Sequence, residues 1–266
     1  ATLAQHFDDL RAQLRGSYSE GLRDFFFVNT DVGAPELALS VARSVVLTEP
    51  TRTAAIIRCL LPRTFIDCNR SVDRETVAAA SERGEMTPGL PPWVVHDQDR
   101  DLLLDRYFAY REVVTRGFSG VCGGGGRAVC LHTYAPRSID VAVDDDIVAA
   151  LHAAYAPDRI GSWPLRAEVD LITRDPDGRE LADSALAQRA EQALSTAGFQ
   201  VVRNDTYSLH PSTLAFAFAQ QYAGKTLCLE LRRDLLLPEF VPFVELYTDP
   251  QAIERAAVPL AKALAR

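Results

Sequence analysis

The sequence lacks paired cysteines, long apolar runs and an excess of positive charge. Its five cysteines include no Cys-x-x-Cys pair, which argues against a disulfide framework and favours a reduced, cytoplasmic protein. No apolar stretch approaches the roughly 20 residues that a membrane helix needs, and the first residues lack the basic and apolar regions of a signal peptide. The formal net charge of -8 argues against a nucleic-acid-binding surface. We therefore expect neither nucleic acid nor a membrane as a partner.

The remaining composition is that of an ordinary globular protein. The chain has 266 residues, of which 47% are hydrophobic and 24% charged, and this is ample for a full core. No internal repeat or low-complexity segment interrupts it. We expect a single domain over residues 1–266, although two small domains would also fit the length.

Short apolar runs alternate with segments of helical periodicity along the whole chain. Strands are expected at 25–28, 54–60, 64–68, 127–132, 165–173, 199–203 and 225–231. Helices are expected at 3–15, 35–45, 99–116, 181–197, 211–222 and 250–264, with another ending near Leu151. This alternation predicts an α/β fold with a mixed, mostly parallel sheet covered by helices on both faces, in three layers.

Three of the expected strands lead to polar residues. The run Thr64–Cys68 stops on Asn69 and Arg70, another ends on His132, and a third leads into Glu230. In an α/β sheet, strand ends line the crevice where ligands bind. An arginine fork grips a carboxylate with two hydrogen bonds, histidine is a natural zinc ligand, and a glutamate can act as a base. Together they indicate hydrolysis of an amide on an acidic substrate.

Each of these residues also has a structural interpretation. Asn69 and Arg70 would otherwise form a turn and a surface ion pair, and His132 would be a hydrogen-bonded strand-edge residue. Glu230 interrupts an apolar run, where an unpaired carboxylate is costly, so we favour a functional role over an ion pair with a neighbouring arginine. Asp67 has the same cost, and for it we favour a structural carboxylate.

Oxygen ligands could come from the turn after the first expected strand. Asp31 and Glu36 lie there and could complete a metal site with His132. Their alternative roles are a helix N-cap and an acid in the first helical turn, which are the commoner uses of such residues.

The order of several short motifs resembles the N-formylglutamate amidohydrolase family, which is related to aspartoacylase and succinylglutamate desuccinylase. Ile66–Arg70 resembles its "DLNR" signature. Thr87–Pro91 resembles the family's proline-glycine loop, and Tyr107–Arg111 resembles its tyrosine-rich helix. Val129–Thr133 resembles the "DLHS" strand, with Pro136–Ser138 after it. Asn204–Ser208 resembles the "N-x-P-Y-S" loop, and Leu227–Arg232 resembles "LQLELR". The resemblance covers roughly residues 25–240.

The resemblance implies a phosphorylase/hydrolase-like fold, shared with zinc carboxypeptidases, and one zinc ion held by two histidines and an acidic residue. It implies that His132 is the second of these histidines and Glu230 the general base and acid. Asn69 and Arg70 would hold the substrate carboxylate, with Arg137 as a further substrate-binding residue.

The chain departs from the family pattern at the first metal motif. Asp31 stands where a histidine is expected, and Cys130 replaces the aspartate of the "DLH" strand. One histidine with two carboxylates would make a harder site, weaker for zinc. A different metal, or none, is compatible with this change.

The resulting hypothesis is a metal-dependent amidohydrolase, with one divalent metal, zinc by resemblance, bound by Asp31, Glu36 and His132. Its partner would be a small carboxylated amide such as an N-acyl amino acid, with formyl, a larger acyl group or a short peptide left open. The alternative is a non-catalytic relative that keeps the fold and the carboxylate pocket but has lost the metal.

Overall fold

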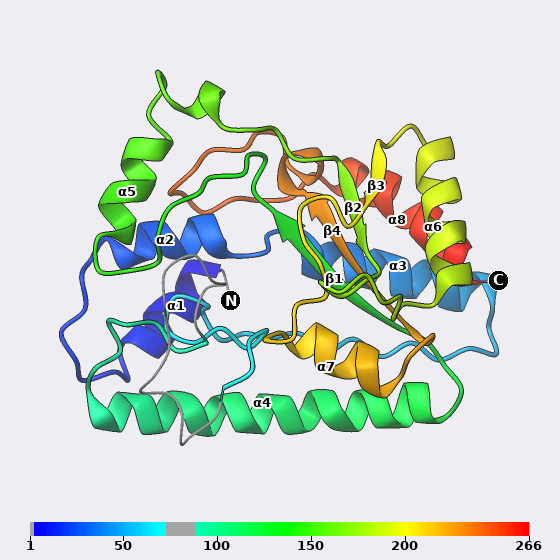
Figure 1. Cartoon of the computed structure of the whole chain (residues 1–266), viewed down its shortest axis with the longest axis horizontal. Coiled ribbons are helices and arrows are strands. Elements are labelled where there is room, and N and C mark those ends of the chain that lie inside the picture. Colours follow the sequence, from blue (N-terminus) through cyan, green and yellow to red (C-terminus); the bar gives the residue numbers. More distant parts are fainter. Residues whose placement is uncertain (1–2, 73–88, 266) are drawn as a thin grey trace.

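Four strands form one open sheet in the computed structural model, which describes residues 3–72 and 89–265. The order across the sheet is β1-β4-β2-β3 (Figure 1), with β1 at Ala128–Tyr134, β4 at Thr226–Arg232, β2 at Val169–Ile172 and β3 at Val201–Arg203. β1 runs parallel to β4 and β2 parallel to β3, whereas β2 and β4 are antiparallel. The predicted mixed, mostly parallel sheet is confirmed.

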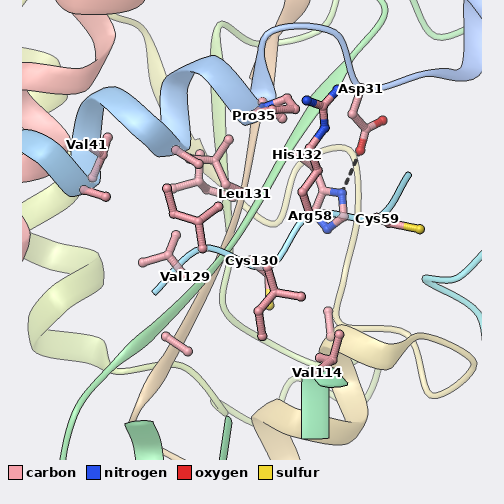
Figure 2. Close-up of a pocket in the computed structure, with 18 of the residues that line it drawn as sticks. Asp31, Pro35, Val41, Arg58, Cys59, Val114, Val129, Cys130, Leu131 and His132 are labelled. Carbon is pink, nitrogen blue, oxygen red and sulfur yellow. Dashed lines mark hydrogen bonds and ion pairs between the residues drawn. The ribbon is translucent and has the colours of Figure 1, made fainter. Parts of the chain in front are cut away.

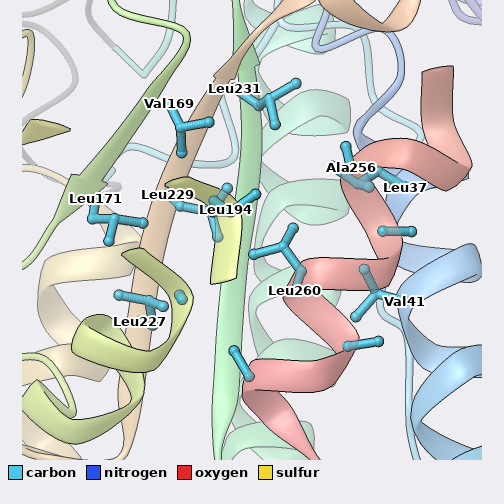
Figure 3. Close-up of a cluster of buried hydrophobic side chains, with 14 of the residues drawn as sticks. Leu37, Val41, Val169, Leu171, Leu194, Leu227, Leu229, Leu231, Ala256 and Leu260 are labelled. Carbon is cyan, nitrogen blue, oxygen red and sulfur yellow. The ribbon is translucent and has the colours of Figure 1, made fainter. Parts of the chain in front are cut away.

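One face of the sheet is covered by three helices, namely α3 (Ala34–Thr48), α6 (Ser184–Thr196) and α8 (Pro250–Leu264). α3 begins after Gly33, whose φ of +91° is a left-handed value that glycine adopts without strain. Leu37, Val41 and Val45 recur every four residues and give the helix a single buried face. They pack against leucines of the sheet and of α8 such as Leu229 and Leu260 (Figure 3).

The opposite face is covered by α7 (Leu214–Gln221) and the long α4 (Asp97–Gly123), which runs beneath the sheet in Figure 1. Side chains alternate between the faces along a strand, so Leu227, Leu229 and Leu231 enter the first core while Cys228 points toward α7. By the same alternation Glu230 lies on the face of Cys228. The sheet therefore has helices on both sides, as the sequence predicted.

A further apolar cluster joins the N-terminal helices to α4. α1 (Leu3–Arg11), α2 (Leu22–Asn29) and α5 (Ile147–Ala154) gather to the left of the sheet in Figure 1. Phe7, Phe26 and Phe65 lie at the centre of this cluster, with neighbouring ring centroids 5.2 Å apart. Two short 3-10 helices, η2 (Ile160–Ser162) and η3 (Arg233–Leu236), complete the order. Among the described helices, none is both long and apolar enough to cross a membrane.

Three strand predictions were wrong. Residues 25–28 belong to helix α2, where Leu22, Phe25 and Phe26 share one buried face at helical spacing. Residues 54–60 are extended but in no strand, and most of them are exposed. Residues 64–68 form turns instead. A short apolar run alone does not distinguish these states. Thr87 and Pro88 of the proline-glycine motif lie outside the described residues.

Candidate functional site

A row of three titratable side chains crosses the sheet on the α7 face. His132 of β1 is the register partner of Glu230 in β4, and Glu230 is the register partner of Asp170 in β2. Register partners in neighbouring strands lie side by side, at the strand spacing of about 4.8 Å. The sheet therefore brings together the histidine and the glutamate that the sequence selected, and adds a carboxylate that it did not.

Asp31 joins this row from the loop between α2 and α3. Its Oδ2 atom lies 2.8 Å from Nδ1 of His132 (Figure 2). Burial opposes the charge on Asp31, but Arg63 and the hydrogen bond with His132 outweigh it and lower its pKa to about 2. Burial likewise opposes the charge on His132, yet the hydrogen bond and charge of Asp31 raise its pKa above the usual value. The pair thus favours an ionised aspartate with a protonated imidazole.

Arg63 links two carboxylates at this site. One guanidinium nitrogen lies 3.1 Å from Oδ1 of Asp31 and the other 2.9 Å from Oδ2 of Asp67. Burial opposes the charge of Arg63, but these carboxylates outweigh it and raise its pKa. The turns at 64–68 place Asp67 here. Its Oδ1 accepts the backbone N–H of Asn69, which supports the structural interpretation of Asp67.

Glu230 is the most strongly perturbed acid of the row. Burial raises its pKa, the charge of His132 partly opposes this, and Asp31 adds to it, so that the pKa lies at about 7. Its Oε2 atom is buried and has no hydrogen-bond partner among the described residues. A carboxylic acid that titrates near neutrality beside a histidine is suited to proton transfer.

The predicted carboxylate-binding residues have different surroundings. Asn69 lines the groove that contains Asp31 and His132. Arg70 is buried, with its guanidinium 3.9 Å from Asp67. Arg137 donates to the carbonyl of Trp163 at 2.6 Å and so anchors the turn around η2. Substrate binding by these three residues stays a prediction.

Glu36 is exposed in the first turn of α3. No hydrogen bond or ion pair between described residues joins it to Asp31 or His132. This position matches the helix-terminus interpretation of Glu36, in which an acid stabilises the positive end of the helix dipole.

Sequence reasoning missed Arg63, Asp170, Arg166 and Arg233. Asp170 carries the signal that revealed Glu230, a carboxylate inside an apolar run, and accepts the backbone N–H groups of residues 205 and 206. The guanidinium of Arg166 donates a hydrogen bond to the hydroxyl of Tyr207, and its charge lowers the pKa of Glu230. Arg233 is 1% exposed and donates to Val28 and Thr133 carbonyls. Nothing in the sequence distinguishes the three arginines from ordinary surface residues, since arginine is common at protein surfaces.

The donor set does not fit a tightly held zinc ion. Such an ion takes three or four protein ligands in tetrahedral geometry. In residues 3–72 and 89–265, no group of three His, Cys, Asp or Glu side chains is arranged to hold a metal. Both oxygens of Asp31 are engaged, one by His132 and one by the cationic Arg63, and that positive charge opposes a second cation.

These features define an α/β protein with a cluster of acidic, histidine and arginine side chains on one face of an open sheet. The model of the N-formylglutamate amidohydrolase family matches residues 9–237. The chain belongs to this family, whose members are hydrolases.

Solved structures show the same fold. The crystal structure of N-formylglutamate amidohydrolase from Ralstonia eutropha JMP134 superposes with a TM-score of 0.57 at 17% identity, covering 94% of this chain and 86% of that one. A gene product of Agrobacterium tumefaciens gives a TM-score of 0.50 at 16% identity, covering 89% and 77%. None of the curated proteins searched matches the chain.

Proposed function

We propose that this protein hydrolyses the amide bond of a small N-acylated carboxylate, such as an N-acyl amino acid, with Glu230 as the general base. The observation that carries the proposal is the state of Glu230. Its pKa of about 7 and its unpartnered, buried Oε2 leave it ready to accept a proton at neutral pH. Its neighbour His132 lines the same groove as Asn69 and Arg63.

The reaction needs one water molecule and no external oxidant or reductant. Ionised Glu230 takes a proton from water while the water oxygen attacks the carbonyl carbon. Glu230 then passes that proton to the amide nitrogen, the C–N bond breaks, and an amine and a carboxylic acid leave. General acid–base help of this kind contributes about 10²- to 10⁴-fold in rate.

The negative charge that forms on the carbonyl oxygen must be stabilised. In this proposal the protonated imidazole of His132 supplies the stabilising charge. Asp31 keeps that imidazole protonated and fixes its orientation through Nδ1, which leaves Nε2 as the donor. Pre-oriented donors of this kind are worth roughly 10²- to 10³-fold in kcat.

The substrate carboxylate would be held by Asn69 and Arg70. Asn69 lines the groove. Arg70 is the next residue in the chain and is buried outside the groove lining, with Asp67 as its counter-charge. Fixing the carboxylate positions the amide carbonyl, which converts binding energy into orientation.

The direct test is an assay of N-formylglutamate and N-acetylglutamate, with release of free glutamate as the readout. It is run on the protein as purified, after chelator treatment, and after adding Zn²⁺, Mn²⁺ or Co²⁺, with metal content measured in each sample. Glutamate release from either substrate, unaffected by chelator, is the result expected from the residues present. Release only with a bound metal would restore the metal-dependent mechanism predicted from the sequence. No release from any N-acyl amino acid under these conditions would contradict the proposal.

One observation favours a second function, that of a non-catalytic binding protein. Arg63 forms ion pairs with both Asp31 and Asp67, and Asp31 stands where the family resemblance places a histidine. A protein of this kind would bind N-acyl amino acids without turnover. Calorimetric binding without glutamate release, together with less than a tenth of an equivalent of metal, would support it.

A further inference from the structure

A large apolar groove extends from the candidate site. It has a volume of about 1020 Å³, and its lining includes Asp31, Arg63, Asn69 and His132. Figure 2 shows the Asp31–His132 pair next to the apolar side chains of β1. The groove thus reaches His132 and Asn69 of the proposed function, whereas Glu230 and Arg70 are not among its lining residues.

Its walls come from both layers of helices. Val41 of α3 and Leu131 of β1 contribute on one side, and Val114 of α4 and Phe218 of α7 on the other. Four charged residues in the lining have exposed side chains, namely Glu36, Arg52, Arg58 and Arg127.

The outer wall is the extended segment 53–61. Its Ile57 lies against Gly117 of α4, where a Cβ atom would come within 2.3 Å of the Ile57 Cδ1. The absence of a side chain at Gly117 therefore allows this close approach. Ile56 and Ile57 are 44% and 37% exposed, so apolar surface of this segment is open to a ligand in the groove.

We infer that the groove holds a long aliphatic acyl chain, so that the substrates are N-acyl amino acids with fatty acyl groups. This inference rests on the proposed function for the chemistry at the polar end. A formyl group has two heavy atoms, whereas cavities of about 300–1,000 Å³ bury ligands of drug size. A formyl group would leave nearly all of this groove empty, whereas a long acyl chain would occupy a substantial part of it. Hydrolysis would break the C–N bond, add water, and give a fatty acid and a free amino acid.

Binding is measured first, separately from turnover. The variant Glu230→Gln removes the base, and calorimetry then gives its Kd for N-formyl-, N-butanoyl-, N-octanoyl- and N-dodecanoylglutamate. Each buried CH₂ group contributes roughly 0.8 kcal/mol, which is about a four-fold gain in affinity. We expect octanoylglutamate to bind at least 30-fold more tightly than butanoylglutamate. An affinity that does not change along the series would overturn the inference.

A substitution inside the groove locates the chain. Ala42 of α3 lines the groove and is partly exposed, so Ala42→Phe would fill it. This variant should lower the ratio of dodecanoyl- to formylglutamate affinity at least ten-fold, and Ala153→Phe, at an exposed position of α5, should not. Thermal unfolding of both variants checks that they are folded. Equal ratios in the two variants would contradict the assignment of the groove.

Two outcomes separate this inference from the proposed function. Affinity that rises with chain length, with no turnover by the unsubstituted protein, would support the acyl groove and contradict the hydrolase. Turnover of N-formylglutamate alone, with affinities that do not change with acyl chain length, would support the hydrolase and contradict the acyl groove. Tighter binding of an acetylated apolar peptide than of dodecanoylglutamate would show that an extended peptide occupies the groove, and would overturn the acyl inference.

Discussion

Glu230 and His132 are register partners in the parallel ladder of β1 and β4, on the sheet face covered by α7. Neither strand alone makes a site, since each carries one titratable residue in an apolar run. Their pairing places an acid with a pKa of about 7 beside an imidazole that Asp31 holds protonated. The charge of His132 opposes the effect of burial, so the protonated imidazole lowers the pKa of Glu230.

The stability of the protein should fall as the pH rises through neutrality because of Glu230. Its folded-state pKa of about 7 lies above the ordinary value of 4.5. The stability that comes from burying the neutral acid is therefore complete below pH 4.5 and lost as the pH rises through about 7. The loss amounts to at most about 3 kcal/mol. Urea denaturation of the unsubstituted protein and Glu230→Gln at pH 5 and pH 8 should show a relative gain for the variant at pH 8. A difference that does not depend on pH would contradict the shifted pKa.

Catalysis should show the opposite dependence on pH. The base form of Glu230 is its ionised form, so kcat/KM should rise about ten-fold per pH unit below pH 7. It should fall again at higher pH, where His132 loses the proton that stabilises the oxyanion. The profile is measured with N-acylglutamate from pH 5 to 9. A rate already close to its full value at pH 5, as expected for a glutamic acid with the ordinary pKa of 4.5, would contradict the raised pKa of Glu230.

Asp31→Asn should lower both the stability of the fold and the pKa of His132. Asp31 has a pKa of about 2, below the ordinary 3.8, so its ionised form adds stability that is lost only as the pH falls toward 2. At pH 7 the substitution should cost about 2 kcal/mol of unfolding free energy. It should also lower the pKa of His132, measured by NMR. Asp140→Asn is the matched control, because Asp140 is exposed and lies outside the helices and strands, and both quantities should stay unchanged in it.

Arg70→Lys should raise KM for acidic substrates about ten-fold or more and leave kcat within a few-fold. Lysine keeps the charge but loses the planar fork that holds a carboxylate with two hydrogen bonds. Arg174→Lys serves as control, since Arg174 pairs with Glu180 at the surface. An unchanged KM in Arg70→Lys would remove Arg70 from carboxylate binding.

The sheet and most helices could be predicted because their signals are local. Asp183 and Thr213 cap α6 and α7 by accepting the N–H groups of Leu186 and Phe216, and the expected helices begin within three residues of them. The strand ending on His132 and the strand containing Glu230 were both recognised. Residues 25–28 were misassigned because Phe25–Val28 is a solid apolar run, whose period is visible only with Leu22 included.

The rest of the site depends on tertiary contacts. Nothing near Arg63 in the sequence indicates that its guanidinium bridges Asp31 and Asp67, because 32 residues separate Arg63 from Asp31. The pairing of Glu230 with Asp170 likewise depends on the antiparallel register of β2 and β4. Asp67 itself was interpreted as structural, and its contacts agree.

The measurement that tests the central claim most directly is the rate of glutamate release from an N-acylglutamate by the unsubstituted protein and by Glu230→Gln at pH 8. Glu191→Gln, at a surface ion pair with Arg203, is the control. Loss of the general base should reduce kcat at least 100-fold in Glu230→Gln, with the Kd of the substrate nearly unchanged, and leave Glu191→Gln at full activity. Equal rates for the unsubstituted protein and Glu230→Gln would show that Glu230 is not the base and would contradict the proposed mechanism.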